Sequence, residues 1–354
     1  MYIQELKLNH FRNYESLHIQ LDKGINLFKG NNAQGKTNIL ESIYLCATAR
    51  SHRTAQEKEV IMWQQEAAHV YLNVKKHTFE DKIDFHIAQK GKNVAINKLP
   101  VNKLGDLFGT LTVVMFSPED LQLIKKSPKE RRRFIDIELC QFDKMYYYSL
   151  KQYYKVLKQR NNLLKTRDID EEMLDVWDMQ FIEYAKEVID KRQLFIKELN
   201  EVASQIHKDI SGNCENLEVV YEPNVLSDNI EDKLTRYRKK DILSQNTSVG
   251  PHRDDLKFLI NGMDVRLYGS QGQQRTVVLS MKLAELSLME KNLGESPILL
   301  LDDVLSELDD NRQKYLFHYT ENIQTLITCT GIEQGVWNTQ KIGKLFNVRN
   351  GNIV

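Results

Sequence analysis

Hydrophobic and polar residues alternate over short stretches in the first third of the chain, which is typical of strands buried on one face. The alternation is clear at 17–21, 70–74 and 83–87. A short apolar run at 25–28 is followed by a segment, 36–49, whose apolar residues recur at helical spacing. The pattern predicts a strand-rich region with one helix after the apolar run.

A different periodicity begins at 117–118, where a proline after serine, followed by two acids, indicates the start of a helix. Apolar residues then recur every three to four positions in two long stripes, at 146–164 and 174–206. A short polar segment at 167–170 separates the stripes. The chain up to about residue 245 is therefore predicted to be mainly helical, with a short antiparallel helix hairpin.

Strand patterns return in the last third of the chain. An alternating run at 256–260 precedes Asn261-Gly262, a dipeptide typical of two-residue hairpin turns. A helical pattern covers 272–291, and the run at 298–301 has the continuous apolar character of a strand buried on both faces. Strand-rich sequence at both ends thus flanks a helical insertion.

This order of elements predicts the α/β fold class and two lobes. A chain of 354 residues is also longer than a single hydrophobic core usually supports. We expect residues 1–116 and 246–354 to form one lobe, a mixed sheet with helices and an antiparallel β subdomain. Residues 117–245 should form the second, helical lobe.

Composition is ordinary for a soluble globular protein, with 41% hydrophobic and 28% charged residues. Mean hydropathy is −0.49, and no apolar run is long enough to span a bilayer. The N-terminal segment lacks the pattern of a signal peptide, so we expect a cytoplasmic protein without a membrane partner. Zinc and disulfide motifs are not indicated, because the four cysteines lie far apart: Cys46, Cys140, Cys214 and Cys329.

The net charge is zero, so the chain as a whole gives no electrostatic indication of a nucleic-acid partner. The charge is unevenly distributed, because residues 119–170 hold 13 Lys and Arg against 8 Asp and Glu. A solvated helix face explains this local excess as well as a DNA surface does.

The strongest chemical signal is a sequence of the form GxxxxGK[ST] between the apolar run at 25–28 and the helix at 36–49. Its glycines allow backbone N–H groups to surround phosphates at the positive end of a helix. Lys36 would neutralise the outer phosphates of ATP, and the hydroxyl of Thr37 would hold Mg²⁺. The phosphate loop, as we name it, comprises Gly30, Asn31, Asn32, Ala33, Gln34, Gly35, Lys36 and Thr37.

Two acids follow the buried strand predicted at 298–301. Carboxylates at the carboxyl end of a parallel strand lie beside the phosphates that a neighbouring loop binds. Asp302 suits coordination of Mg²⁺, and Asp303 suits polarisation of an attacking water. Lys36 and Asp303 are the predicted catalytic residues, and Thr37 and Asp302 the predicted metal ligands.

The segment 268–275 resembles the LSGGQ-type signature of ATP-binding-cassette ATPases. Ser270 and Gly272 match the serine and second glycine of that signature, and Gln271 replaces its first glycine. The resemblance implies that this segment reaches the γ-phosphate held by another subunit. An ordinary helix N-cap is the alternative. The segment 306–309 likewise resembles the dimer-contacting loop that follows the catalytic acid in this superfamily.

Several further blocks resemble the bacterial RecF family of SMC-like ATPases: 11–14, 30–37, 51–53, 116–121, 131–134, 250–255 and 269–273. The resemblance implies a P-loop ABC-type ATPase head without a long coiled coil. It implies binding of ATP and Mg²⁺, homodimerisation with ATP bound, and slow, DNA-stimulated hydrolysis. The implied role is recombinational repair on duplex and gapped DNA, with RecR and RecO, in loading RecA.

The resemblance also suggests residues that contact ligands. Arg12 is expected at the phosphates or at the adenine side of the site, unless it is a plain surface arginine. Arg50, His52 and Arg53 are expected to link nucleotide to DNA, and His252 and Arg253 to serve either site. The expected contacts to DNA phosphates are Lys125, Lys126, Arg131, Arg132 and Arg133.

Two departures from general ABC ATPases stand out. Asp303 replaces the more common glutamate, and Thr330 lies where a switch histidine is usual. Both departures favour slow hydrolysis. The loop 117–120 also has no glutamine to bind Mg²⁺.

Four other functions fit parts of the pattern. The ATPase subunit of a transporter would have the missing glutamine and histidine. A P-loop kinase would leave the segment at Ser270 unexplained. Another SMC-like ATPase, and a nucleotide-dependent scaffold that needs no hydrolysis, remain open alternatives.

Overall fold

The computed structural model describes residues 1–54, 56–331 and 342–354. It divides into two compact units, the first comprising Met1–Asp120 and Lys282–Val354 and the second Leu121–Met281. In the described part of the chain, no helix combines the length and the apolar character that a membrane crossing requires.

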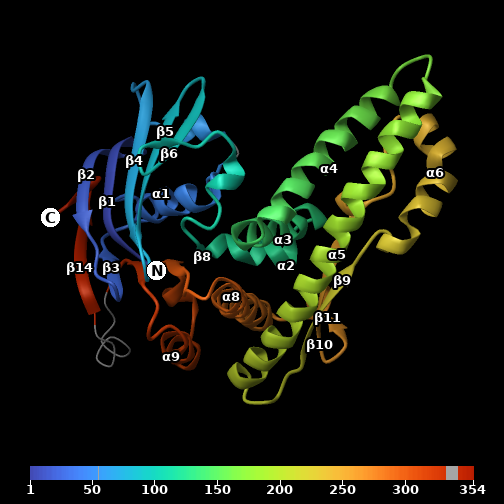
Figure 1. The fold of residues 1–354 in the computed structure, drawn as a ribbon. Helices are drawn as coiled ribbons and strands as arrows, with labels where there is room; N and C mark the ends of the chain where they lie inside the picture. Colours follow the sequence, from blue (N-terminus) through green and yellow to red (C-terminus); the bar gives the residue numbers. More distant parts are fainter. Residues whose placement is uncertain (55, 332–341) are drawn as a thin grey trace. The chain divides into compact units, whose positions relative to one another are not determined.

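An antiparallel sheet forms the outer part of the first unit, in the order β2-β1-β4-β5-β6-β7 (Figure 1). The alternating pattern of the sequence explains it, since every second side chain of β5 is buried. The strands are β1 (Tyr2–Phe11), β2 (Tyr14–Gln20), β4 (Ala67–Lys75), β5 (Glu80–Ala88), β6 (Gly91–Ile96) and β7 (Leu99–Pro100).

The second sheet of this unit is mainly parallel and has the order β15-β14-β3-β13-β12-β8. Strands β8, β12 and β13 are buried along their whole length, as their continuous apolar runs predict. The strands are β3 (Ile25–Lys29), β8 (Val113–Phe116), β12 (Ile298–Asp302), β13 (Thr325–Cys329), β14 (Ile342–Arg349) and β15 (Asn352–Ile353). The carboxyl ends of β3, β13, β12 and β8 therefore meet at one edge.

Helix α1 (Lys36–Thr48) follows β3 and contacts strands of both sheets. It is buried on nearly all sides, which is why its sequence has only a weak polar face. Helix α9 (Asp310–Tyr319) connects β12 to β13. The short helices of the unit are η1 (Glu57–Val60), η2 (Leu104–Asp106), η3 (Pro118–Leu121) and η6 (Val304–Glu307).

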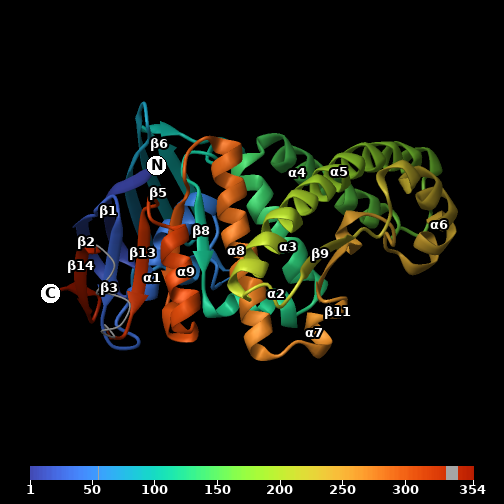
Figure 2. The ribbon, with the colours of Figure 1, turned by 90° about the horizontal axis from the view of Figure 1, so that it is seen from below.

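Helices dominate the second unit. Helices α4 and α5 run side by side (Figures 1 and 2), and Asp143 and Asp170 cap their N-termini with side-chain hydrogen bonds. The helices are α2 (Gln122–Lys125), α3 (Pro128–Phe142), α4 (Lys144–Leu163), α5 (Glu171–Ile210), η4 (Ser227–Asn229), α6 (Ile230–Ser244), η5 (Pro251–Arg253) and α7 (Val265–Tyr268). Helix α8 (Gln271–Leu293) begins in this unit and continues into the first.

A three-stranded sheet of order β11-β10-β9 belongs to the helical unit. Its strands are β9 (Leu217–Glu222), β10 (Asp255–Ile260) and β11 (Met263–Asp264). Because β10 pairs with β9 along its whole length, residues 246–281 lie with the helices, whereas the predicted lobes placed them with the ATPase lobe. Which functions the two lobes carry stays a prediction.

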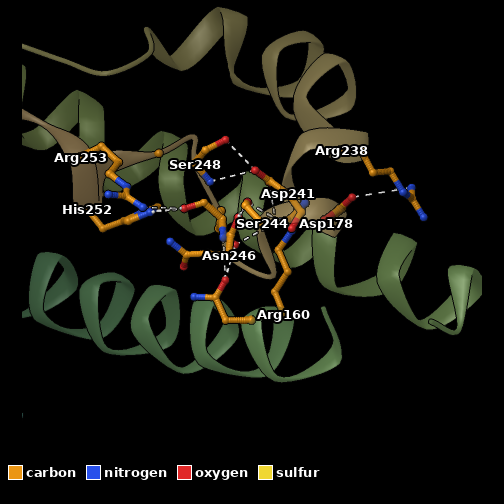
Figure 3. Close-up of polar contacts among 12 residues, drawn as sticks. Arg160, Asp178, Arg238, Asp241, Ser244, Asn246, Ser248, His252 and Arg253 are labelled. Carbon is orange, nitrogen blue, oxygen red and sulfur yellow. Dashed lines mark hydrogen bonds and ion pairs between the residues drawn. The ribbon is translucent and has the colours of Figure 1, made fainter. Parts of the chain in front are cut away.

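A buried arginine fixes the loop that precedes η5 (Figure 3). Nε of Arg160 donates to Asp178 at 2.6 Å, and its Nη1 donates to Asp241 at 2.9 Å and to the hydroxyl of Thr247 at 2.8 Å. Asp241 also accepts from the backbone N–H and the hydroxyl of Ser248. Since Arg160 and Asp241 are fully buried, this network holds the loop from inside the unit.

Candidate nucleotide-binding site

The phosphate loop connects β3 to α1 at the edge where the parallel strands end. Gly30 N–H donates to the carbonyl of Cys329 at 3.2 Å. A Cβ at Gly30 would lie 2.3 Å from the carbonyl oxygen of Val348, so only glycine fits there. Gly35 has φ of 110°, a backbone conformation that other residues rarely adopt. Steric constraints thus explain why glycine occupies both of these positions in the sequence motif.

The ammonium of Lys36 is directed into this loop. Its Nζ donates to the carbonyl oxygens of Gly30 at 2.7 Å and Asn31 at 2.8 Å. Burial lowers the pKa of Lys36, and the nearby Asp303 counteracts that effect. A cation held by the phosphate loop is suited to bind phosphate oxygens.

Oxygen atoms from three segments meet beside Lys36. The hydroxyls of Thr37 and Thr328 donate to the same Oδ1 of Asp302, at 2.8 and 2.7 Å. Asp303 N–H donates to the hydroxyl of Thr328 at 2.9 Å. Burial raises the pKa of Asp302, although both threonine hydrogen bonds act against it. A hydroxyl and a carboxylate are the oxygen ligands that Mg²⁺ prefers.

These residues line a cleft of about 370 Å³. Of the predicted site, the cleft brings together Asn32, Ala33, Gly35, Lys36, Thr37, Asp302 and Asp303. Asn13, Asn38, Arg53 and Thr328 complete its lining. Arg53 therefore lies at this cleft, where it donates to Asn38 at 2.9 Å. The roles of all these residues stay predictions.

The hairpin formed by β14 and β15 contacts the phosphate loop, a contact that the sequence analysis missed. Asn350 N–H donates to the side chain of Gln34 at 2.8 Å, and Gly351 N–H donates to its carbonyl at 3.0 Å. Asn13 bridges loop and helix, since its amide donates to Gln34 and accepts from Asn38. Apart from the phosphate loop itself, the sequence analysis had singled out only Asn13 of this contact, within the block 11–14.

Gly351→Ala should weaken both the fold and nucleotide binding. Gly351 has φ of 71°, and a Cβ there would lie 2.2 Å from the carbonyl oxygen of Asn13. We expect a loss of about 1–3 kcal/mol in the free energy of unfolding, measured with urea. Gly91→Ala is the matched control, because Gly91 also has positive φ, at 147°, but open space around it. Equal effects of the two substitutions would contradict the clash.

Arg12 binds a buried acid. Its Nε and Nη2 donate to the two carboxylate oxygens of Glu41 at 2.9 and 2.6 Å. Burial acts to raise the pKa of Glu41, but hydrogen bonds from Arg12 and Ser51 hold it below its ordinary value. The structure shows that the guanidinium of Arg12 binds Glu41 through two hydrogen bonds. The expected contact of Arg12 with nucleotide stays a prediction.

His52 is not suited to the DNA contact predicted for it. Both of its ring nitrogens are buried, and neither has a hydrogen-bond partner among the described residues. The ring packs edge-on against Tyr44, and burial lowers the pKa of His52 to about 4. A neutral, enclosed imidazole is a poor ligand for a phosphate. Arg50, two residues earlier, is exposed.

The basic cluster around α3 separates into exposed and buried members. Lys125 and Lys126 are exposed, as a DNA contact requires. Arg131 is 2% exposed and binds Asp255 through two hydrogen bonds, at 2.5 and 2.9 Å. The structure argues against the predicted contact of Arg131 with DNA, because Asp255 neutralises its charge inside the protein.

The next two arginines of α3 differ from Arg131. Arg132 donates to the backbone carbonyl of Asp254 at 2.6 Å, and Arg133 is half-buried. Their contacts with DNA stay predictions.

His252 and Arg253 belong to η5, directly after the loop that Arg160 holds (Figure 3). His252 accepts from the hydroxyl of Tyr153 at 2.5 Å and donates to the carbonyl of Thr247 at 3.0 Å. Burial lowers the pKa of His252 to about 4, which favours the neutral form. The role predicted for His252 stays a prediction. Arg253 is exposed.

Ser270 caps helix α8 in the second unit. Its hydroxyl accepts from Gln273 N–H at 3.2 Å, and Ser270 N–H donates to the side chain of Gln273 at 2.9 Å. These two hydrogen bonds form a capping box, so Ser270 acts as the N-cap of α8. The predicted contact of Ser270 with a γ-phosphate stays a prediction. The described residues give no steric reason for a glycine at position 272, since a Cβ there would meet only the hydroxyl of Ser270 at 3.9 Å.

The loop after β8 contains a carboxyl that titrates in an unusual range. Oδ2 of Asp120 accepts from Ser117 N–H at 2.7 Å, and burial raises the pKa of Asp120 to about 6. The folded protein therefore binds this proton more tightly than the unfolded chain, whose aspartate pKa is about 4. The stability that this group contributes is largest at low pH and falls as pH rises from about 4 to about 6.

Asp120→Asn should remove that pH dependence. The asparagine keeps the acceptor for Ser117 but does not titrate. The free energy of unfolding of the wild type minus that of the variant should fall with rising pH, by at most about 1.4 kcal/mol per pH unit. Urea titrations between pH 4.5 and 7.5 measure this difference, and a constant difference would contradict the assignment.

Sequence comparisons agree with the geometry. The family model RecF/RecN/SMC N terminal domain matches residues 2–353. A protein of Agathobacter rectalis named DNA replication and repair protein RecF is 50% identical over 357 residues, covering 100% of this chain and 99% of that protein. The chain belongs to the RecF family. A RecF of Clostridium perfringens is 48% identical over 359 residues, with the same coverage.

Solved structures agree with membership of the RecF family. A structure of the recombination mediator protein RecF with ATP, in the RecFOR pathway, matches with a TM-score of 0.93 and 36% identity over 100% of this chain and 97% of that one. The Smc head domain of Pyrococcus furiosus shares the fold, with a TM-score of 0.57 and 16% identity over 100% and 96% of the chains. The predicted fold class, an α/β ABC-type head with a helical insertion, is confirmed.

Proposed function

We propose that this RecF-family chain is an ATP-dependent DNA-binding protein of recombinational repair and replication-fork maintenance. The observation that carries the proposal is the convergence of Lys36, Thr37 and Asp302 in one cleft at the carboxyl edge of a parallel sheet. Phosphate-binding loops and metal-binding acids lie at this edge in nucleotide-binding α/β proteins. The relatives named for DNA replication and repair agree with it.

The residues of the cleft fit ATP and Mg²⁺. Backbone N–H groups of the phosphate loop and the ammonium of Lys36 bind phosphates, and Thr37 with Asp302 supplies oxygen ligands for Mg²⁺. When bound, the metal neutralises charge that develops on the phosphates. Asp303 lines the same cleft, and in this proposal it orients and polarises a water. Its short side chain favours slow hydrolysis.

A second copy of the chain is the partner that fits Ser270. The hydroxyl of Ser270 already accepts from Gln273, so its own hydrogen remains available for a phosphate oxygen. The segment that precedes Ser270 in the chain exposes three apolar side chains: Met263 at 61%, Leu267 at 64% and Tyr268 at 72% exposure. A surface that joins an anion-binding helix N-terminus to apolar residues suits a homodimer that encloses ATP.

The DNA contact should be largely independent of sequence. The exposed cations Arg50, Lys125, Lys126 and Arg253 are suited to bind backbone phosphates. Affinity for duplex and gapped DNA should therefore fall steeply with salt. DNA should stimulate the weak ATPase, and the chain should act with RecR and RecO in loading RecA.

Size measurements test the proposal most simply. The protein is sized by light scattering with ATP, with ADP and without nucleotide, each with and without gapped DNA. We expect a dimer with ATP, strengthened by DNA, and a monomer in the other conditions. A monomer in every condition would overturn the proposed function.

A further inference from the structure

Glu215, in the segment between α5 and β9, binds the residue that completes the cap of α8. Oε1 of Glu215 accepts from Nε2 of Gln273 at 2.8 Å. Oε1 of Gln273 in turn accepts from Ser270 N–H at 2.9 Å. A continuous chain of hydrogen bonds therefore connects a carboxylate near the end of α5 to the backbone of Ser270.

The carboxylate determines which way the Gln273 amide points. An ionised carboxylate only accepts hydrogen bonds, so Nε2 of Gln273 must face Glu215. The oxygen of the same amide is then directed at Ser270 N–H, as the capping box requires. Without Glu215, only the hydrogen bond from Ser270 N–H keeps the amide in this orientation.

His207 holds the other oxygen of Glu215. Nε2 of His207 lies 3.0 Å from Oε2 of Glu215, and its Nδ1 lies 3.2 Å from the hydroxyl of Ser280 on α8. His207 is fully buried and belongs to the last turn of α5. Ser211 at the end of α5 accepts from Glu215 N–H at 3.3 Å. The carboxylate is thus fixed from two sides.

We propose that Glu215 is a positioning residue for ATP-dependent dimerisation: through Gln273 it holds Ser270 in the geometry that receives a phosphate from a second copy of the chain. This inference rests on the proposed function. In this proposal Glu215 itself does not contact the nucleotide. Its role is to keep the Ser270 N–H occupied and the Ser270 hydroxyl hydrogen directed outward, so that the cap is formed before the partner arrives.

The first test separates assembly from nucleotide binding. Glu215→Ala should raise the concentration for half-maximal ATP-dependent dimerisation about five- to tenfold, the effect expected from loss of a helix cap. Binding of a fluorescent ADP to the phosphate loop should not change. Lys191→Ala is the matched control, because it breaks a 2.8 Å ion pair with Asp143 in the same unit. Its dimerisation should equal that of the wild type.

An exchange of the two side chains gives the decisive result. The single substitution Gln273→Glu places a second carboxylate against that of Glu215. It should weaken dimerisation at least as much as Glu215→Ala. The double variant Glu215→Gln, Gln273→Glu restores one donor and one acceptor, and glutamate is a favourable capping-box residue. Dimerisation should recover to within about twofold of the wild type. Thermal unfolding is measured for every variant.

The outcomes distinguish the two proposals. If the wild type does not dimerise with ATP, the proposed function fails and this inference fails with it. If the wild type dimerises but Glu215→Ala dimerises equally well, only the positioning role of Glu215 is overturned. The positioning role of Glu215 is also overturned if the double variant dimerises no more tightly than Gln273→Glu alone.

Discussion

Lys36→Ala is expected to lower the affinity for ATP by about 100-fold or more and to abolish ATP-dependent dimerisation. The ammonium donates to two carbonyls at the centre of the phosphate loop, and two charge-assisted hydrogen bonds to phosphates are together worth about 3 kcal/mol or more. Isothermal titration with ATP measures the affinity.

The control for this substitution is Lys23→Ala, which removes an exposed lysine from the same unit. Its affinity for ATP should equal that of the wild type. Because Nζ of Lys36 donates to two backbone carbonyls, thermal unfolding of the variant is measured alongside ATP binding. Wild-type affinity in the Lys36 variant would show that the phosphate loop is not the nucleotide site.

Asp303→Asn is expected to reduce ATP hydrolysis by about 100-fold or more while ATP-dependent dimerisation persists. The backbone of Asp303 has φ of 55°, a conformation that asparagine adopts readily, and its N–H is held by Thr328. The substitution therefore removes a charge and leaves the loop unchanged. Single-turnover hydrolysis and the lifetime of the dimer measure the two effects.

The same variant separates a DNA clamp, opened by hydrolysis, from a nucleotide-dependent scaffold. A clamp that cannot hydrolyse ATP should stay closed and fail to restore repair in cells that lack the protein. A scaffold would restore repair fully with Asp303→Asn. Full restoration with no detectable hydrolysis would therefore favour the scaffold.

The contiguous parts of the site could be predicted from the sequence. The phosphate loop is one uninterrupted segment, and Asp302 and Asp303 directly follow an apolar strand, so local pattern was sufficient. Parallel strands then bring Lys36 and Asp302 to the same edge without further information. The α/β class followed from the same alternation of elements.

Contacts between distant segments could not be predicted. The charge of Arg131 looked available because its partner, Asp255, lies 124 positions away. Gly351 and Asn350 hold Gln34 from more than 300 positions further along the chain, with no local motif to indicate it. His52 looked polar in sequence, but only packing shows that both of its ring nitrogens are buried.

The central claim is that the site is completed by a second chain, and mixing two inactive variants tests it most directly. Lys36→Ala disables the phosphate loop, and Ser270→Arg obstructs the cap of α8. In a symmetric dimer of one variant with the other, one site carries both defects and the second site carries neither.

Each variant alone should hydrolyse almost no ATP, whereas an equimolar mixture should hydrolyse ATP well above either variant alone and at up to about half of the wild-type rate, since each mixed dimer has one intact site of two. Hydrolysis that stays at background in the mixture, although the wild type is active at the same concentration, would contradict a site shared between two chains.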